Sequence, residues 1–261
     1  MIVSSQDSVC LSGVTNEASS HTARAKSGRR FLATASISAM AMMLSHTAQT
    51  QLPTGCTPNM PVAEDTVTCL GTITETIATT VDDLTIVVGD GTMPTTVTTT
   101  VGDGINVNAT GGQSITVAAG SSVVGASDGI NVNNGSGALT LNLAGDVTGL
   151  NGDGIYAFNG GEGNYAFNGG GGNTLVTTAD VTVTGNYGTA IDVENNYYAV
   201  DLTVNTAAGT ISGYSGIYAE NDGTGNTLVT TADVTATGNY GLALRVENDD
   251  YAGDLLSLIH I

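Results

Sequence analysis

Residues 127–134 read SDGINVNN, and the same phrase has already occurred at residues 103–108 as DGINVN. Six copies can be aligned, and in each the second position is Ile or Leu and the fourth is Val or Ala. The third and fifth positions are mostly polar or aromatic. This alternation with period 2 predicts that each copy is one β-strand with its aliphatic side chains turned inward. The copies begin at Gly104, Gly129, Gly154, Ala190, Gly216 and Ala243.

The copies recur at a nearly constant interval along the chain, with one longer gap between the third and the fourth. That gap contains a direct duplication, YAFNGGEGN at residues 156–164 and YAFNGGGGN at residues 165–173. Without the duplicated unit, the repeat has a period of about 25 to 27 positions throughout. Each period also holds two further stretches of alternating apolar residues, as in ALTLNLAGDVTG at residues 138–149. Three short strands per period describe one coil of a parallel β-helix, with coils about 4.8 Å apart.

We therefore expect an all-β fold, a right-handed parallel β-helix (a solenoid) with an N-terminal cap and first coils at residues 49–100 and a repeat array at residues 101–255. An antiparallel sandwich is the rival fold, but it does not require a constant coil length. The sixth position of the phrase becomes a column of asparagines. Asparagine tolerates left-handed turn geometry, and stacked amides can hydrogen-bond along the column. They are Asn134, Asn159, Asn195, Asn221 and Asn248.

Residues 1–48 have the features of an N-terminal extension and a secretory signal peptide. Four of the five cations precede the apolar segment FLATASISAMAMML at residues 31–44, which is too short to span a bilayer. We expect an N-terminal signal helix, cleavage near Ala48 and export; a buried helix is the alternative. In an exported chain, Cys56 and Cys69 are candidates for a disulfide that closes a small N-terminal loop.

The charge balance argues against several classes of partner. The formal net charge is −19, and all but two of the 24 carboxylates lie beyond residue 30, where Arg245 is the single cation. Such a surface cannot neutralise a nucleic-acid backbone, and it disfavours anionic membranes. It suits a secreted protein that must stay soluble.

The residue types needed for most enzyme chemistry are missing from the expected mature region. Residues 49–255 contain no histidine and no lysine, so we expect no catalytic residues, no cofactor-binding residues and no metal ligands, and we expect that the chain is not an enzyme. Glycosidases need only two placed carboxylates. The adjacent pairs Asp82-Asp83 and Asp249-Asp250 should point to opposite faces of a strand, and we interpret them as turn residues.

Two outward features could bind a ligand. Glu194, Glu220 and Glu247 share the fifth position of three consecutive coils, where like charges about 4.8 Å apart could hold Ca²⁺ weakly; we favour a hydrated, screened acidic face. Tyr156 and Tyr218 occupy the outward third position. Aromatic rings there can stack on sugars or anchor a protein partner, although tyrosine also simply favours strands.

A longer copy reinforces the array. Residues 172–202 and 225–255 are identical at 24 of 31 positions, and the second segment lies two coils after the first. The likeness stops after Leu255, where the chain continues LSLIHI. Residues 256–261 resemble the translated end of a transposase-based sequencing adapter, and we expect them to be an artefact; a genuine apolar last strand is the alternative.

Three features together resemble the passenger domains of bacterial autotransporters. They are the signal-like N terminus, the cysteine pair in GCTPNMPVAEDTVTCLGTIT at residues 55–74, and coils of the pattern GIxVxN, LTVN and GxIxG. The resemblance covers about residues 55–255. It implies a right-handed β-helix on the surface of a Gram-negative cell or shed from it. It also implies a partner, a C-terminal outer-membrane β-barrel that acts as translocator.

The resemblance further implies a structural or adhesive role for a monomeric passenger, with a glycan or protein on a host or neighbouring cell as its target. Two alternatives stay open. One is a secreted β-helical carbohydrate-active protein of glycosidase type. The other is a filamentous adhesin that a separate partner exports.

Overall fold

A computed structural model describes residues 51–160, 171–179, 182–249 and 252–259. The predicted extension and signal helix at residues 1–48, and most of the nine-residue duplication, lie outside the described residues. The described residues form strands and turns, with no helix. In particular, they include no helix with the length and apolar character of a membrane span.

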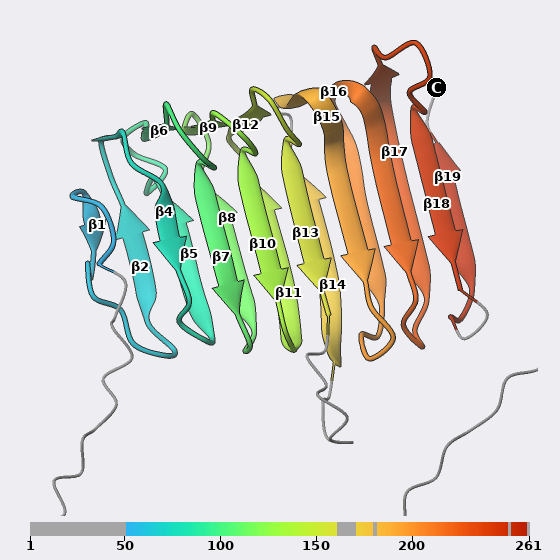
Figure 1. Cartoon of the computed structure of the whole chain (residues 1–261), viewed down its shortest axis with the longest axis horizontal. Helices are drawn as coiled ribbons and strands as arrows, with labels where there is room; N and C mark the ends of the chain where they lie inside the picture. The colour runs from blue at the N-terminus through green and yellow to red at the C-terminus, as the bar shows by residue number, and fades with distance from the viewer. Residues whose placement is uncertain (1–50, 161–170, 180–181, 250–251, 260–261) are drawn as a thin grey trace, which may run out of the picture. The chain divides into compact units, whose positions relative to one another are not determined.

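The strands form three parallel sheets, because the chain turns a corner after each strand and each strand pairs with its counterpart in the next coil. Figure 1 shows the coils stacked in chain order, from blue at the N-terminal end to red at the C-terminal end. Sheet 1 contains β2 (Thr66–Cys69), β5 (Leu84–Val88), β8 (Gln113–Val117), β11 (Gly137–Leu143), β14 (Gly171–Thr178), the start of β16 (Leu202–Asn221), the start of β17 (Thr227–Ala236) and β19 (Leu255–Ile259).

The other two sheets carry the remaining strands. Sheet 2 contains β3 (Thr72–Ile73), β6 (Thr96–Thr98), β9 (Ser122–Gly125), β12 (Asp146–Gly149), the start of β15 (Thr182–Asn195), the middle of β16 and the end of β17. Sheet 3 is made of the recurring phrase and contains β4 (Ile77–Thr79), β7 (Ile105–Ala109), β10 (Ile130–Asn134), β13 (Ile155–Asn159), the ends of β15 and β16, and β18 (Leu244–Asn248).

The predicted parallel β-helix is confirmed as a solenoid of about seven turns, and the sandwich alternative is wrong. Ile130 pairs in parallel with Ile105 on one side and Ile155 on the other, so the sequence period is the coil length. The inward side chains of these strands are fully buried. The aliphatic column of sheet 3 consists of Ile77, Ile105, Ile130, Ile155, Ile191, Ile217 and Leu244.

In the first three copies of the phrase, its aspartate ties one coil to the next. A carboxylate oxygen of Asp103 accepts the backbone N–H of Asp128 at 3.2 Å, and Asp128 accepts that of Asp153 at 2.8 Å. Asp153 in turn accepts the N–H of Thr189 at 2.6 Å. The asparagine three positions later holds the carboxylate in place, as when Asn131 donates to Asp128 at 2.8 Å. The phrase therefore recurs because it satisfies backbone donors across coils as well as filling the core.

The glycine of the phrase lets neighbouring coils approach closely. A Cβ atom at Gly129 would lie 2.6 Å from the carbonyl oxygen of Gly154 and 2.6 Å from a methyl group of Val147. Backbone cannot move away by that much without breaking the coil-to-coil hydrogen bonds, so a side chain is excluded at this position.

The asparagine column is buried from Asn134 to Asn221 and partly exposed at Asn248, and its side chains hydrogen-bond along part of the stack. Asn134 donates to Asn159 at 3.1 Å, and the Thr174 hydroxyl then links Asn159 to Asn195 with bonds of 2.9 and 2.6 Å. The left-handed geometry that asparagine tolerates is not used here. These asparagines are the last residues of extended strands, and the described non-glycine residues with positive φ are Glu64 and Asp83.

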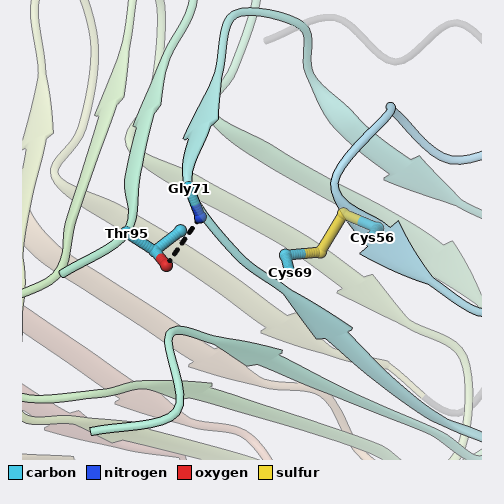
Figure 2. Close-up of a disulfide and its surroundings, with 4 residues drawn as sticks. All are labelled: Cys56, Cys69, Gly71 and Thr95. Carbon is cyan, nitrogen blue, oxygen red and sulfur yellow. Dashed lines mark hydrogen bonds between the residues drawn. A yellow bond between two sulfur atoms is a disulfide. The ribbon is translucent and has the colours of Figure 1, made fainter. Parts of the chain in front are cut away.

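The predicted disulfide between Cys56 and Cys69 is confirmed. It joins β1 (Cys56–Thr57) to β2, which run antiparallel with the two cysteines opposite each other and their Cα atoms 3.9 Å apart (Figure 2). The side chains of Cys56 and Leu52 are buried at this end of the core. Just beyond, Gly71 donates to the Thr95 hydroxyl of the next coil at 3.2 Å. The first coil is thus closed by a strand of opposite direction.

The long copy of the repeat does not keep one register throughout. In sheet 1, Val176 and Val229 occupy the same column, and the sequence alignment of the two copies also matches these two residues, so structure and alignment agree. In sheet 2, Val183 shares its column with Val234, although the aligned copies pair Val183 with Ala236. The pairing has thus slipped by two positions. Such a slip keeps the same kind of side chain inward, so the alternating pattern does not oppose it.

The last strand, β19, departs from the pattern of the array. Ser257 occupies the column of Val229, while the flanking Leu256 and Leu258 are 52% and 45% exposed. Relative to β17, a serine thus replaces an inward valine and Leu258 replaces the outward Thr230. The interpretation of residues 256–261 as an adapter artefact stays a prediction.

The buried asparagines give a direct test of the stack. Asn159→Ala removes the side chain that accepts from Asn134 and donates to Thr174, leaving polar atoms unpaired in the core. We expect a loss of about 1–3 kcal/mol in the free energy of unfolding, measured by urea denaturation. Asn133→Ala, one position before β10 ends and exposed, is the matched control and should change stability by less than about 0.5 kcal/mol. Equal effects of the two changes would contradict a structural role for the column.

Candidate functional site

The outward side of sheet 3 changes character along the stack. Its third-position column begins with amides and continues with aromatic and charged residues: Asn106, Asn131, Tyr156, Asp192, Tyr218 and Arg245. Its fifth-position column follows the same course: Asn108, Asn133, Phe158, Glu194, Glu220 and Glu247. We call the last four rows of both columns, from Tyr156 and Phe158 to Arg245 and Glu247, the aromatic–acidic face.

The structure brings together residues that the sequence placed separately. Tyr156 and Tyr218 flank Asp192 as its direct neighbours on the two adjoining strands, and Glu194 and Glu220 stand beside them in the next column. The position of each side chain is fixed by the same register that packs the aliphatic residues on the opposite side of the strands. The face is therefore as rigidly spaced as the core beneath it.

At the end of the face an internal cation is held by a ring and a carboxylate. The guanidinium carbon of Arg245 lies 4.9 Å from the centre of the Tyr218 ring. Arg245 also donates two hydrogen bonds to Glu247, at 2.9 and 2.8 Å. The Tyr218 hydroxyl donates to Glu220. This group combines a cation–π contact with a bidentate ion pair.

Two strands earlier, the same arrangement lacks a cation. Tyr156 stands opposite Asp192, and Phe158 stands opposite Glu194. Burial raises the pKa of the Asp192 carboxyl to about 7, and repulsion from Asp153, Glu194 and Glu220 adds to this effect. One carboxylate oxygen of Asp192 is buried and has no hydrogen-bond partner.

The pKa values of three neighbouring groups are raised as well. Burial, followed by the charges of Glu220 and Asp222, raises the pKa of Glu194. Burial and the charge of Asp128 raise the pKa of Asp153, despite the hydrogen bond from Thr189. Burial and the charges of Glu194 and Asp192 also raise the pKa of the Tyr156 hydroxyl. Negative charge is therefore concentrated around Tyr156 without compensation.

The predicted column of Glu194, Glu220 and Glu247 is confirmed, because the three residues pair in register. They are not equivalent, since Glu247 binds Arg245 and Glu220 accepts from Tyr218. The described residues contain no group of three or more His, Cys, Asp or Glu arranged to hold a metal ion, and weak calcium binding stays untested. Beside the column lies an open pocket of about 410 Å³, lined by Glu220, Asp222, Val246, Glu247, Asn248 and Asp249.

The adjacent aspartate pairs serve turns where they are described. Asp82 accepts the backbone N–H groups of Thr110 and Gly111 at 2.7 and 3.0 Å, and Asp83 accepts that of Gly112 at 2.8 Å. Burial acts to raise the pKa of Asp82, but the hydrogen bonds from Thr110 and Gly111 outweigh it and lower the pKa. This fits the turn interpretation. Asp250, of the second pair, lies outside the described residues.

Sequence reasoning missed Asp192, Asp153 and Phe158 as parts of the site. The aligned copies contained the signal for Asp192, because it is the residue between Tyr156 and Tyr218 in the third-position column. Asp153 was less visible. Its carboxylate reaches the face from the preceding turn, and only the folded corner brings it near Asp192.

Stability should depend on pH through Asp192. Its pKa is 3.8 when unperturbed and about 7 in the folded protein, so the folded state binds the proton more tightly. The resulting stabilisation is complete below about pH 4 and is lost as pH rises to about 7. Asp192→Asn should therefore raise the free energy of unfolding at pH 8 by about 2 kcal/mol, and have little effect at pH 4.

The measurement is urea denaturation of wild type and variant from pH 4 to pH 8. The groups that face Asp192 are Asp128, Asp153, Glu194 and Glu220, and all are unchanged in the variant. Asp233→Asn, on the exposed side of sheet 2, removes the same charge elsewhere and is the control. A wild-type profile that runs parallel to that of Asp192→Asn would refute the assignment.

Comparison of this chain with protein-family models, with curated proteins and with solved structures finds no match. Its function is therefore argued from its own residues.

Proposed function

We propose that the chain is a surface-displayed or secreted passenger of autotransporter type, with a structural and adhesive role and no catalysis of its own. The observation that carries the adhesive part is the aromatic–acidic face. The core does not need Tyr156, Tyr218 or the carboxylates around them, and burial and repulsion disfavour the ionised form of Asp192 there. Groups that reduce stability at a regular surface are typical of binding sites.

Further exposed tyrosines support an adhesive role. Tyr187, Tyr214 and Tyr240 lie in the corners between sheets 2 and 3 of consecutive coils, and are 75%, 42% and 91% exposed. Exposed aromatic rings favour association because they bury a large area with few rotatable bonds. Repetition over adjacent coils would give weak contacts the benefit of multivalency.

The proposed export route fits the acidic, disulfide-closed solenoid. A disulfide between Cys56 and Cys69 is typical of an oxidising compartment outside the cytosol. The partner in this proposal is a C-terminal translocator barrel encoded downstream, and the location is the outer membrane or the medium of a Gram-negative cell. The targets are glycans or proteins on a host or neighbouring cell.

Sequencing the genomic locus past codon 255 tests the export route. We expect the reading frame to continue through further coils into about a dozen strands of alternating hydrophobicity that end in an aromatic residue. A stop codon shortly after a polar capping coil would reject autotransport and leave a free secreted solenoid.

Removal of the two tyrosine rings on the outward side of sheet 3 tests the adhesive role. Beads coated with the Tyr156→Ala, Tyr218→Ala double variant should retain less than about one fifth of wild-type binding to glycan arrays and to whole cells. The control is Thr140→Ala, Thr203→Ala, which alters the outward side of sheet 1. Binding that is absent in wild type, or unchanged in the double variant, would exclude this face as the adhesive surface.

A secreted glycosidase is the second candidate, because Asp192 with a pKa of about 7 beside other carboxylates has the properties of a general acid. The same panel of glycans distinguishes the two functions. Hydrolysis by wild type that is abolished in Asp192→Asn would establish the enzyme. Binding of glycans without their hydrolysis supports the adhesive function.

A further inference from the structure

One end of the aromatic–acidic face holds a cation that belongs to the chain itself. At its C-terminal end, Tyr218 has the guanidinium of Arg245 over its ring, and Arg245 is anchored by two hydrogen bonds to Glu247 in the same strand. Arg245 comes from the strand directly beside that of Tyr218. The Tyr218 ring and the Glu247 carboxylate of the neighbouring strand thus form a binding position for a planar cation, which we call a seat.

Around Tyr156, two strands earlier, the same register brings together a tyrosine ring and an outward carboxylate of the neighbouring strand, but no cation of the chain. Tyr156 corresponds to Tyr218, and Glu194 corresponds to Glu247, since each pair shares one column of the sheet. In the position of Arg245 the neighbouring strand carries Asp192. An internal cation is thus replaced by a carboxylate, and one oxygen of that carboxylate is buried without a partner.

We propose that Tyr156, Asp192 and Glu194 form a binding site for the guanidinium group of an arginine-bearing segment of a partner protein. The ring of Tyr156 takes the flat side of the ion, and the carboxylates of Asp192 and Glu194 accept its N–H groups. This inference rests on the proposed adhesive function and names the class of its target.

Guanidinium fits this site better than other cations. Its planar fork can stack on a ring and still form parallel hydrogen bonds with a carboxylate, whereas an ammonium ion acts as a point charge. Burial is the main cause of the raised pKa values of Asp192 and Glu194, and repulsion from neighbouring carboxylates adds to it; a bound cation would relieve this repulsion.

Residues 31–261 contain no second cation that could occupy this site. Arg245 is the single Arg or Lys among them, and it is already engaged by Glu247 and Tyr218. Phe158, in the row of Glu194, adds apolar surface beside the seat for the aliphatic stem of an arginine. A basic polypeptide also matches the overall charge of −19.

The test uses fluorescein-labelled hexa-arginine, hexalysine and hexacitrulline peptides with the purified full chain, followed by fluorescence anisotropy. Wild type should bind hexa-arginine roughly 5-fold more tightly than hexalysine, and hexacitrulline should not bind. Tyr156→Ala should weaken hexa-arginine binding roughly 5-fold and Asp192→Asn roughly 10-fold. The charge-matched control Asp233→Asn should stay within roughly 2-fold of wild type. Thermal melts establish that each variant is folded.

A gain of binding provides an independent check. Arg245→Gln empties the second seat, so it should raise the number of bound arginine side chains and tighten hexa-arginine binding. Adding Tyr218→Ala to Arg245→Gln leaves the same charge but removes the ring of that seat. The double variant should return to wild-type affinity, and an equal gain in both variants would show that net charge alone is responsible.

Three results would overturn the proposal. One is equal weakening by Asp233→Asn and Asp192→Asn, which indicates diffuse attraction by net charge. Another is equal binding of hexalysine with no effect of Tyr156→Ala. The third is tight binding of chitosan oligomers with none of hexa-arginine, which assigns the site to an amino sugar. If cell adhesion persists in all three cases, the adhesive function stands and only the arginine site is rejected.

Discussion

Parallel pairing between consecutive coils is the constraint on which the structure depends. Each strand finds its hydrogen-bond partners only in the coils before and after it, so every backbone donor and acceptor is satisfied when equivalent residues lie above one another. The aliphatic column of sheet 3 follows from this, as do the aspartate links and the buried asparagines. A residue type that suits one coil is thereby favoured in all of them.

The same constraint shapes the surface. Equivalent outward residues on neighbouring coils are held at the strand spacing. Carboxylates in one column therefore repel each other, because the backbone fixes the distance between them. In the first coils this does not arise, because Asn106 and Asn131 stand where charge appears later and hold the aspartates of the turns. In the later coils Tyr156 and Asp192 occupy the positions of those amides. The hydrogen bonds from amide to aspartate are then missing, and the aromatic–acidic face takes their place.

The sequence predicted the inward side of the fold well, because the period of the phrase is the pairing register itself. It identified the strands and the glutamate column for that reason, whereas the disulfide was predicted from two cysteines in a chain expected to be exported. For the asparagines it offered two reasons, tolerance of left-handed turns and amide hydrogen bonds, and the structure uses the second, in extended strands. It also missed the slip of Val234 in sheet 2, because an alternating segment fits equally well after a shift of two positions. The site was predicted only in part. Tyr156 and Tyr218 lay in the aligned copies, but the proximity of Asp153 to Asp192 depends on how a corner folds.

The duplicated nonapeptide has a consequence for how such a protein can change over generations. The extra unit falls between β13 and β14, and strands on both sides keep the pairing of the regular coils, Ile155 with Ile191 and Leu141 with Val176. The duplication thus lengthens the chain between these two strands without changing how they pair with the neighbouring coils. Copying errors at this point can add sequence while the outward columns of sheet 3 remain in place, so inheritance can vary one part of this protein without disturbing the other.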